Sequence, residues 1–411
     1  MKRRFAVGCL LAVVGCFGSV GCGDDGSSSA DAGNGNDAAA NADAGVAECI
    51  RDPRPADDTR KVVIAHPYDD AGMQAGGYEV YELTSAGALT TTGVTFEMER
   101  AFDGTISFTH DGKIGLSVQD DGTIGIFRLN GDGSVDVLHA AYDAGGVAGF
   151  YATGIVISRL GGMAYVLNGQ WRENGGGIYA LRIHCDDTVS YEGMVAPARL
   201  AYGMQLVPGS DQAVVISEDI MGSAANNGAH LLDWSGAPNL VASADIFGDD
   251  ESIVAGTAIT ADGRFVLAGD NNSFSKIENR IAIGEIATGA LTPKAVLSPI
   301  DDPVSIIASP DNDAVLVVSG FGDAFFELDY DPGDATTPFS LVGEMTYTGG
   351  APQLPSGAVL INRGTLRGRV LVSENTGIRQ VQFESGSITD LGATSTGTGL
   401  AAIVGAIGVQ P

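Results

Sequence analysis

GIVISRLGGMAYVLNGQWRENGGGIYALRIHCDDTVSYEGMV, at Gly154–Val195, is the stretch that decides the fold. It contains four apolar and β-branched runs, GIVIS, AYVLN, GIYALRI and VSYEGMV, separated by Gly-Gly, a polar glycine-rich loop and Asp-Asp. Runs of this length between turn residues are typical of short strands joined by hairpins. The stretch therefore predicts one unit of four consecutive strands, which we call a, b, c and d.

The b strand of this unit recurs along the chain with a nearly constant spacing. It reads VVIAH, IGLSV, AYVLN, AVVIS, FVLAG, VLVVS and VLVS, and neighbouring copies end 49 to 54 residues apart. Asp-Gly, Gly-Gly or Asp-Asn turns precede most copies and suit tight hairpins. A period of this size with four short strands per unit is typical of propeller blades. The sequence therefore predicts an all-β fold, a seven-bladed β-propeller of four-stranded blades over residues 61–411.

The two ends of the repeat array complement each other. The first unit opens directly on a b strand, VVIAH, whereas the last unit is complete and is followed by one more apolar run, Gly399–Val409. We expect this run to supply the missing a strand of the first blade. Such a closure removes the open sheet edges that otherwise pair with other chains.

The fifth unit carries a family resemblance. TADGRFVLAGDNNSFSKIENRIAIGEIATGAL, Thr260–Leu291, resembles a repeat of the YVTN and lactonase-type propellers, and AYVLNGQ, Ala164–Gln170, is similar to the YVTN strand itself. The resemblance covers about 350 residues as architecture. It is a weak guide to function because the fold hosts many unrelated activities.

The first 22 residues read as a targeting signal. Lys2, Arg3 and Arg4 precede a short apolar core, FAVGCLLAVV, that is too short for a permanent membrane span. The end of this segment resembles a bacterial lipoprotein signal, with Cys22 as the acylated residue and Cys16 as the alternative. Secretion without a lipid is the third reading. In each case we expect an extracytoplasmic protein, lipid-anchored to the outer membrane or cell surface in the favoured one.

Residues 23–60 are rich in Gly, Ala, Ser, Asn and Asp and are predicted to form a flexible tether. About 36 residues of such chain have an r.m.s. length on the order of 35 Å. The formal charge is −29. A chain this acidic repels phosphate backbones, which excludes nucleic acid as an expected partner. We expect a monomer, with the membrane as a partner only through the lipid.

Carboxylates recur in the b–c loops, which a propeller places with the d–a links on one face, here called the upper face. An acidic ring there predicts a Ca²⁺ site, because Ca²⁺ takes six to eight oxygen ligands in flexible geometry. The alternative is that these residues serve only as turn formers. The candidate metal ligands are Asp69, Asp70, Asp120, Asp219 and Asp270.

Other upper-face residues are candidates for recognition. His66 ends a b strand at the expected mouth of this face, Trp171 and Arg172 lie on a long b–c loop, and Glu218 begins the next b–c loop. Aromatic and arginine side chains are common binding anchors, although a loop tryptophan also folds over its own blade. We expect an unknown protein or glycan ligand.

No catalytic constellation is evident. The sequence contains no HExxH, GxSxG or Walker motif, and the five histidines are scattered. Lactonase-type propellers hold a cation at the axis with carboxylates, whereas the links expected there are small or apolar except for Asp103. A binding or interaction module is therefore the favoured function, and a metal-dependent lactonase-like hydrolase is the alternative.

Two cysteines remain after the signal is removed, Cys49 and Cys185. Outside the cytoplasm such a pair is expected to be oxidised. Both lie on the expected lower face, one before the first blade and the other in a c–d turn. We therefore predict a Cys49–Cys185 disulfide that pins the tether beneath the propeller.

Overall fold

The computed structural model describes most of the chain from residue 48 onward. The chain divides into two units, Met1–Val46 and Ala47–Pro411, and every described residue belongs to the second. The described residues are 48–69, 73–102, 104–144, 146–147, 150–169, 176–223, 228–248, 254–270, 279–320, 322–375, 377–395 and 405–411. Cys22 lies outside them. Within them no helix has the length and apolar character that a membrane span requires.

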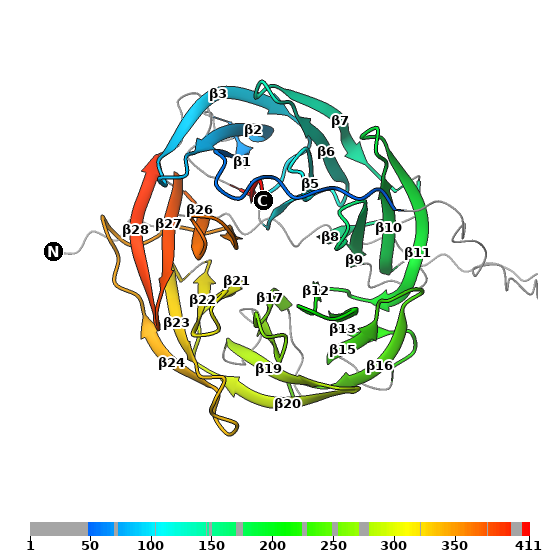
Figure 1. The fold of residues 1–411 in the computed structure, drawn as a ribbon, viewed down its shortest axis with the longest axis vertical. Coiled ribbons are helices and arrows are strands. Elements are labelled where there is room, and N and C mark those ends of the chain that lie inside the picture. The colour runs from blue at the N-terminus through cyan, green and yellow to red at the C-terminus, as the bar shows by residue number, and fades with distance from the viewer. Residues whose placement is uncertain are drawn as a thin grey trace, which may run out of the picture. The chain divides into compact units, whose positions relative to one another are not determined.

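Seven antiparallel sheets are arranged around one axis (Figure 1). Blade 1 is β29 (Ile407–Val409), β1 (Arg60–Tyr68), β2 (Gln74–Leu83) and β3 (Leu89–Glu97). Blade 2 is β4 (Ile106–Phe108), β5 (Ile114–Val118), β6 (Ile124–Leu129) and β7 (Val135–Tyr142). Blade 3 is β8 (Ala152–Ile157), β9 (Met163–Asn168), β10 (Gly177–Ile183) and β11 (Val189–Arg199), extended by the short β14 (Asp219–Ile220).

The remaining four blades repeat the same order. Blade 4 is β12 (Gly203–Leu206), β13 (Gln212–Ser217), β15 (Gly228–Asp233) and β16 (Asn239–Ala244). Blade 5 is β17 (Val254–Ile259), β18 (Phe265–Asp270), β19 (Arg280–Ala287) and β20 (Ala290–Leu297). Blade 6 is β21 (Pro303–Ala308), β22 (Ala314–Ser319), β23 (Ala324–Tyr330) and β24 (Phe339–Glu344). Blade 7 is β25 (Gly357–Ile361), β26 (Arg369–Glu374), β27 (Gly377–Glu384) and β28 (Ser387–Ser395). The predicted seven-bladed propeller is confirmed.

The sequence pattern of each strand follows from its place in the blade. The b strands are buried on both faces, because each sheet packs between two neighbours; all six residues of β22 are buried. The outer d strands alternate between packed and solvent-facing residues, as β24 does. The apolar cores lie between adjacent blades. One such core joins Val62 and Ile64 of blade 1 with Leu371 and Ile378 of blade 7.

The C-terminal strand closes the ring, as predicted. β29 pairs antiparallel with β1, placing Val409 opposite Val62 and Ile407 opposite Ile64. Hydrogen bonds between Ala65 and the residues just before β29 continue the pairing. Ile407 is fully buried in the core between blades 1 and 7. Blade 1 is therefore built from both ends of the chain.

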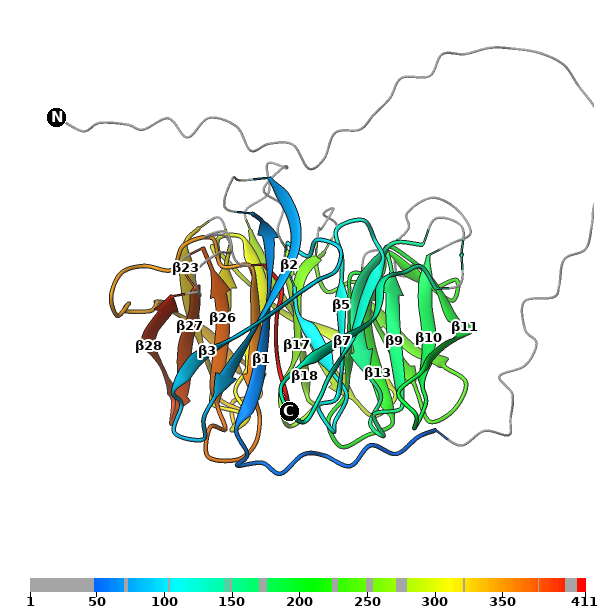
Figure 2. The same ribbon diagram turned by 90° about the horizontal axis from the view of Figure 1, so that it is seen from above.

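Residues 48–59 form an ordered segment, here called the N-terminal strap, on the face opposite the end of the β1–β2 hairpin (Figure 2). A disulfide joins its Cys49 to Cys185 in the β10–β11 turn of blade 3, as the sequence predicts. Farther along, the Arg54 guanidinium donates to the Gln410 side chain (2.8 Å) after β29, and the Thr365 amide of blade 7 donates to Asp57 (2.8 Å). The strap thus connects blades 3, 1 and 7.

The strap lies within the range that composition assigns to the flexible tether, residues 23–60. Its order has a specific cause. Arg51 is 5% exposed, and its guanidinium bridges Asp111 of blade 2 (2.9 Å) and Asp187 of blade 3 (3.0 Å). It also donates to the His184 carbonyl (2.6 Å). Composition counts side chains without their partners, so it does not detect two distant carboxylates that converge on one arginine.

Replacing Arg51 tests how firmly the strap is held. We expect Arg51→Met to lower the free energy of unfolding by about 2 kcal/mol, because two partly exposed carboxylates and a carbonyl lose a charged donor. Equilibrium urea denaturation measures this change. Arg367→Met is the matched control: it removes an exposed pair with Asp311 and is expected to cost less than about 1 kcal/mol. Equal losses in the two variants contradict the strap's role.

Candidate ligand-binding site on the upper face

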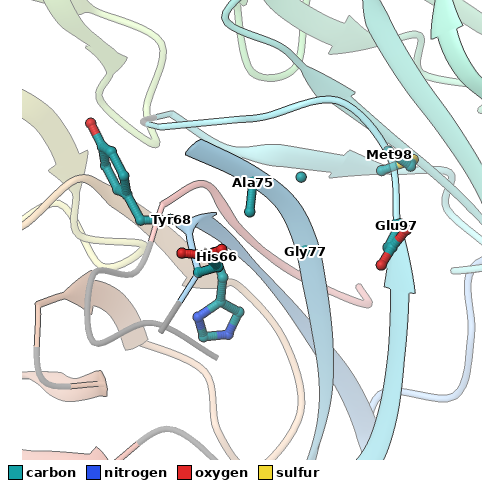
Figure 3. Close-up of a pocket in the computed structure, with 8 residues that line it drawn as sticks. His66, Tyr68, Ala75, Gly77, Glu97 and Met98 are labelled. Atoms are coloured by element: carbon teal, nitrogen blue, oxygen red, sulfur yellow. The ribbon is translucent and has the colours of Figure 1, made fainter. Parts of the chain in front are cut away.

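The b–c hairpins and d–a links meet on the face away from the strap, at the top of Figure 2. We keep the name upper face for it. A pocket of about 200 Å³ opens there in blade 1 (Figure 3). Three strands build it, since His66 and Tyr68 come from β1, Gly77 from β2 and Glu97 from β3. Its full lining is His66, Tyr68, Asp69, Ala75, Gly76, Gly77, Glu97 and Met98.

Small residues make room for this pocket. Ala75, Gly76 and Gly77 follow one another near the start of β2, where larger side chains would fill the space beside His66. Consecutive glycines weaken a strand and often mark a close approach of a ligand or backbone. At Gly76 the close approach is backbone, because a Cβ there would lie 1.7 Å from the Met98 carbonyl oxygen. At the pocket the same short side chains leave open space.

A buried polar network begins at His66, which lines the pocket. His66 is 1% exposed, and its Nε2 lies 3.3 Å from Oε2 of Glu79, which is 3% exposed. The Tyr81 hydroxyl donates to Glu79 Oε2 (3.0 Å), and the Thr91 hydroxyl donates to Oε1 (2.7 Å). Burial acts to raise the pKa of Glu79, but the bonds from His66, Thr91 and Tyr81 outweigh it and lower that pKa. Glu79 is therefore a carboxylate at neutral pH, held directly beneath the imidazole.

Three aromatic residues of the upper face, Tyr68 at the end of β1, Phe102 in the β3–β4 link and Tyr151 in the β7–β8 link, are here called the aromatic ledge. The Tyr68 and Phe102 rings meet edge to face at 6.3 Å. The Phe102 amide donates to Asp120 (2.9 Å), whose carboxylate also binds Arg100 (2.5 Å). Phe102 is 37% exposed and Tyr151 is 44% exposed. The ledge thus presents ring surface beside fixed charges, the mixture that recognition surfaces use.

The predicted metal ligands are held apart by separate partners. Asp120 binds Arg100, and Asp270 is fully buried against Arg280 (2.7 Å). Asp219 accepts from the Ser223 hydroxyl (3.3 Å), and Asp69 accepts from the Met73 amide (2.8 Å). Within the described ranges, no three His, Cys, Asp or Glu side chains are grouped so that they could hold a metal ion. Each of these four carboxylates has a turn or ion-pair partner of its own.

The structure places the predicted recognition residues in different surroundings. His66 lines the pocket, whereas Glu218 pairs with Arg199 on the outer strand of blade 3. Asp70, Trp171, Arg172 and Asp103 lie outside the described residues. Reasoning from the sequence missed Tyr68, Glu79, Phe102 and Tyr151. The sequence does signal Glu79, since an acid between the apolar residues Tyr78 and Val80 of β2 is conspicuous, but the ledge depends on how β1 and two links pack.

Comparison with known proteins finds structures with a similar fold. No protein-family model matches the chain, and no curated protein matches it. The periplasmic gluconolactonase of Pseudomonas aeruginosa is 15% identical, with a TM-score of 0.53 over 70% of this chain and 82% of that one. A Lactobacillus plantarum protein is 14% identical, with a TM-score of 0.59 over 85% and 99%. A functionally unknown protein from Desulfotomaculum acetoxidans is 14% identical, with a TM-score of 0.51 over 86% and 99%. At these identities the likeness shows the propeller fold alone.

The Glu79 network makes the free energy of unfolding depend on pH. Because the folded-state pKa lies below the unfolded value, Glu79 stabilises the fold fully above about pH 4.5. This contribution is lost as the pH falls through the folded-state pKa. We expect Glu79→Gln to cost about 2 kcal/mol at pH 7, a difference that shrinks in acid.

Urea denaturation of both proteins between pH 7 and pH 3.5 measures this effect. Glu344→Gln, an exposed acid on β24, is the matched control and is expected to follow the parent protein. A gap between parent and Glu79→Gln that stays constant over this pH range rules out an ionised Glu79 as the network's centre.

Proposed function

We propose that this protein is an envelope-anchored, extracytoplasmic binding module that recognises a protein or glycan ligand with its upper face. The observation that carries this proposal is the apolar surface left open there. Large apolar side chains exposed on upper-face loops and links are Met73, Phe102, Tyr151, Met221 and Leu354. Exposed aromatic and methionine side chains on loops are suited to anchor a binding partner.

The backbone of the same face supports recognition. Non-glycine residues with positive φ lie mainly in its loops and links, and several have no polar side chain that could favour this conformation. Each such residue costs on the order of 1 kcal/mol, and strained backbone concentrates at functional sites. The upper-face residues with positive φ are Ala144, Leu200, Met221, Asp302, Asp323 and Leu354.

The anchoring part of the proposal rests on the N-terminal sequence. A lipid on Cys22, or on Cys16, would hold the domain through the tether. The described chain begins with the strap, on the face opposite the pocket. A membrane-attached monomer would therefore present the aromatic ledge outward. Metabolic labelling with a radioactive fatty acid in parent and Cys22→Ser cells distinguishes the lipidated cysteine.

Metal-dependent lactone hydrolysis stays the alternative. Its support is the lactonase-type resemblance of the repeats, and fold similarity at 15% identity adds no activity to it. The four described carboxylates predicted as ligands engage four different partners. For that reason we place recognition first.

Two ledge variants test the proposed function. Purified full-length protein is applied to an oligosaccharide array and to immobilised envelope proteins, and the ligand that binds is then titrated. We expect Phe102→Ser and Tyr151→Ser to weaken binding at least tenfold, because exposed aromatic anchors carry much of the affinity. The matched control is Val342→Ser, which removes an apolar side chain of 62% exposure from outer strand β24. Equal binding by all four proteins contradicts an upper-face site.

A further inference from the structure

The lower face carries a cluster of cations that the recognition site does not use. Arg54 comes from the strap, Arg60 begins β1, and Arg363 lies in the β25–β26 loop of blade 7. Arg60 donates from Nη2 to the Arg363 carbonyl (3.2 Å), which fixes these two residues side by side. We call the three residues the arginine cluster.

The cluster contains donors that the protein leaves unsatisfied. Arg60 is 1% exposed, yet its Nε and Nη1 have no hydrogen-bond partner among the described residues. Nη2 of Arg363 is likewise buried, with no partner in the part of the chain that the structure describes. Buried guanidinium groups normally meet carboxylates, as Arg379 does with Glu374 (2.8 Å) and Asp390 (2.7 Å). Three orphaned donors at one place therefore require an explanation.

The charges around the cluster do not explain these orphaned donors. Asp57 and Asp58 of the strap oppose the mutual repulsion, but neither forms an ion pair with the cluster in the described part of the chain. Burial, the neighbouring Arg363 and Arg54 lower the pKa of Arg60. Burial and Arg363 also lower the pKa of His110, across the strap in blade 2. Excess positive charge thus persists within a chain of formal charge −29.

We propose that the arginine cluster is a binding site for a phosphate-type oxyanion. Arg60 and Arg363 each carry buried N–H donors without a partner among the described residues, and guanidinium groups suit phosphate-type oxyanions geometrically. Arg54 and Arg363 are only partly buried, so the site reaches the surface above Arg60. This inference is independent of recognition at the upper face.

Inorganic phosphate is the probe for the first test. Full-length protein is titrated calorimetrically with phosphate and, separately, with chloride at equal ionic strength. Its melting temperature is measured in each salt. We expect saturable phosphate binding and a raised melting temperature. Arg363→Gln and Arg54→Gln should raise the Kd at least tenfold. Arg367→Gln, an exposed arginine of the Arg363 loop that pairs with Asp311, should bind like the parent.

The difference in melting temperature between Arg363→Gln and the parent gives a second readout, because phosphate should change its sign. Without phosphate, Arg363→Gln removes repulsion and a buried orphaned donor, so its melting temperature should equal or exceed the parent's. In saturating phosphate the parent should melt higher than the variant. A purely structural role for Arg363 lowers the variant's melting temperature equally in both buffers and overturns the proposal, as does phosphate binding no stronger than chloride binding.

A third measurement identifies the source of the oxyanion. Full-length Cys22→Ser protein is sedimented with phosphatidylcholine vesicles that contain or lack phosphatidylglycerol. Binding to the anionic vesicles that Arg363→Gln abolishes and free phosphate competes supports a lipid headgroup. Calorimetric phosphate binding without vesicle binding supports a soluble phosphate ligand. Vesicle binding that Arg363→Gln leaves unchanged, with no calorimetric phosphate binding, contradicts the site.

Discussion

The pairing of β29 with β1 is the constraint on which the rest of the structure depends. It joins residues from opposite ends of the chain, and it converts an open array of blades into a ring. Ile407 fills the core between blades 1 and 7, so closure is an apolar packing event as well as a ladder of hydrogen bonds. Because every other blade packs on two neighbours, loss of this one contact exposes apolar surface at both sides of the gap.

The strap reinforces the same closure from below. Its Arg54 donates to Gln410, immediately after β29, while its disulfide and Arg51 bind blades 3 and 2. The strap also brings Arg54 toward Arg60 and Arg363, which places three arginines together on the lower face. The upper face is different in kind, with an acidic pocket and an aromatic ledge.

The sequence predicted the fold in detail because blade repetition leaves a periodic signal of apolar strands and glycine turns. It also predicted the ring closure and the Cys49–Cys185 disulfide, which follow from counting strands and cysteines. The site was predicted only in part. The sequence marks Asp120 and Asp270 as possible metal ligands, but a one-dimensional pattern does not show that Arg100 and Arg280 reach them. The pairing of an acid with its cation, like the ledge and the arginine cluster, is a property of packing between distant segments.

Native-state hydrogen exchange at the closure tests the central claim most directly. The amides of Gly405 and Gln410 donate to carbonyls of β1, and the amide of Ala65 donates to the Ala406 carbonyl. If β29 is an integral strand of blade 1, these amides exchange only through global unfolding, with the same free energy as the amide of buried Val215 in blade 4. Exchange of the three amides at a much lower free energy, while Val215 stays protected, would show that the C-terminal strand detaches freely and that the ring does not depend on it.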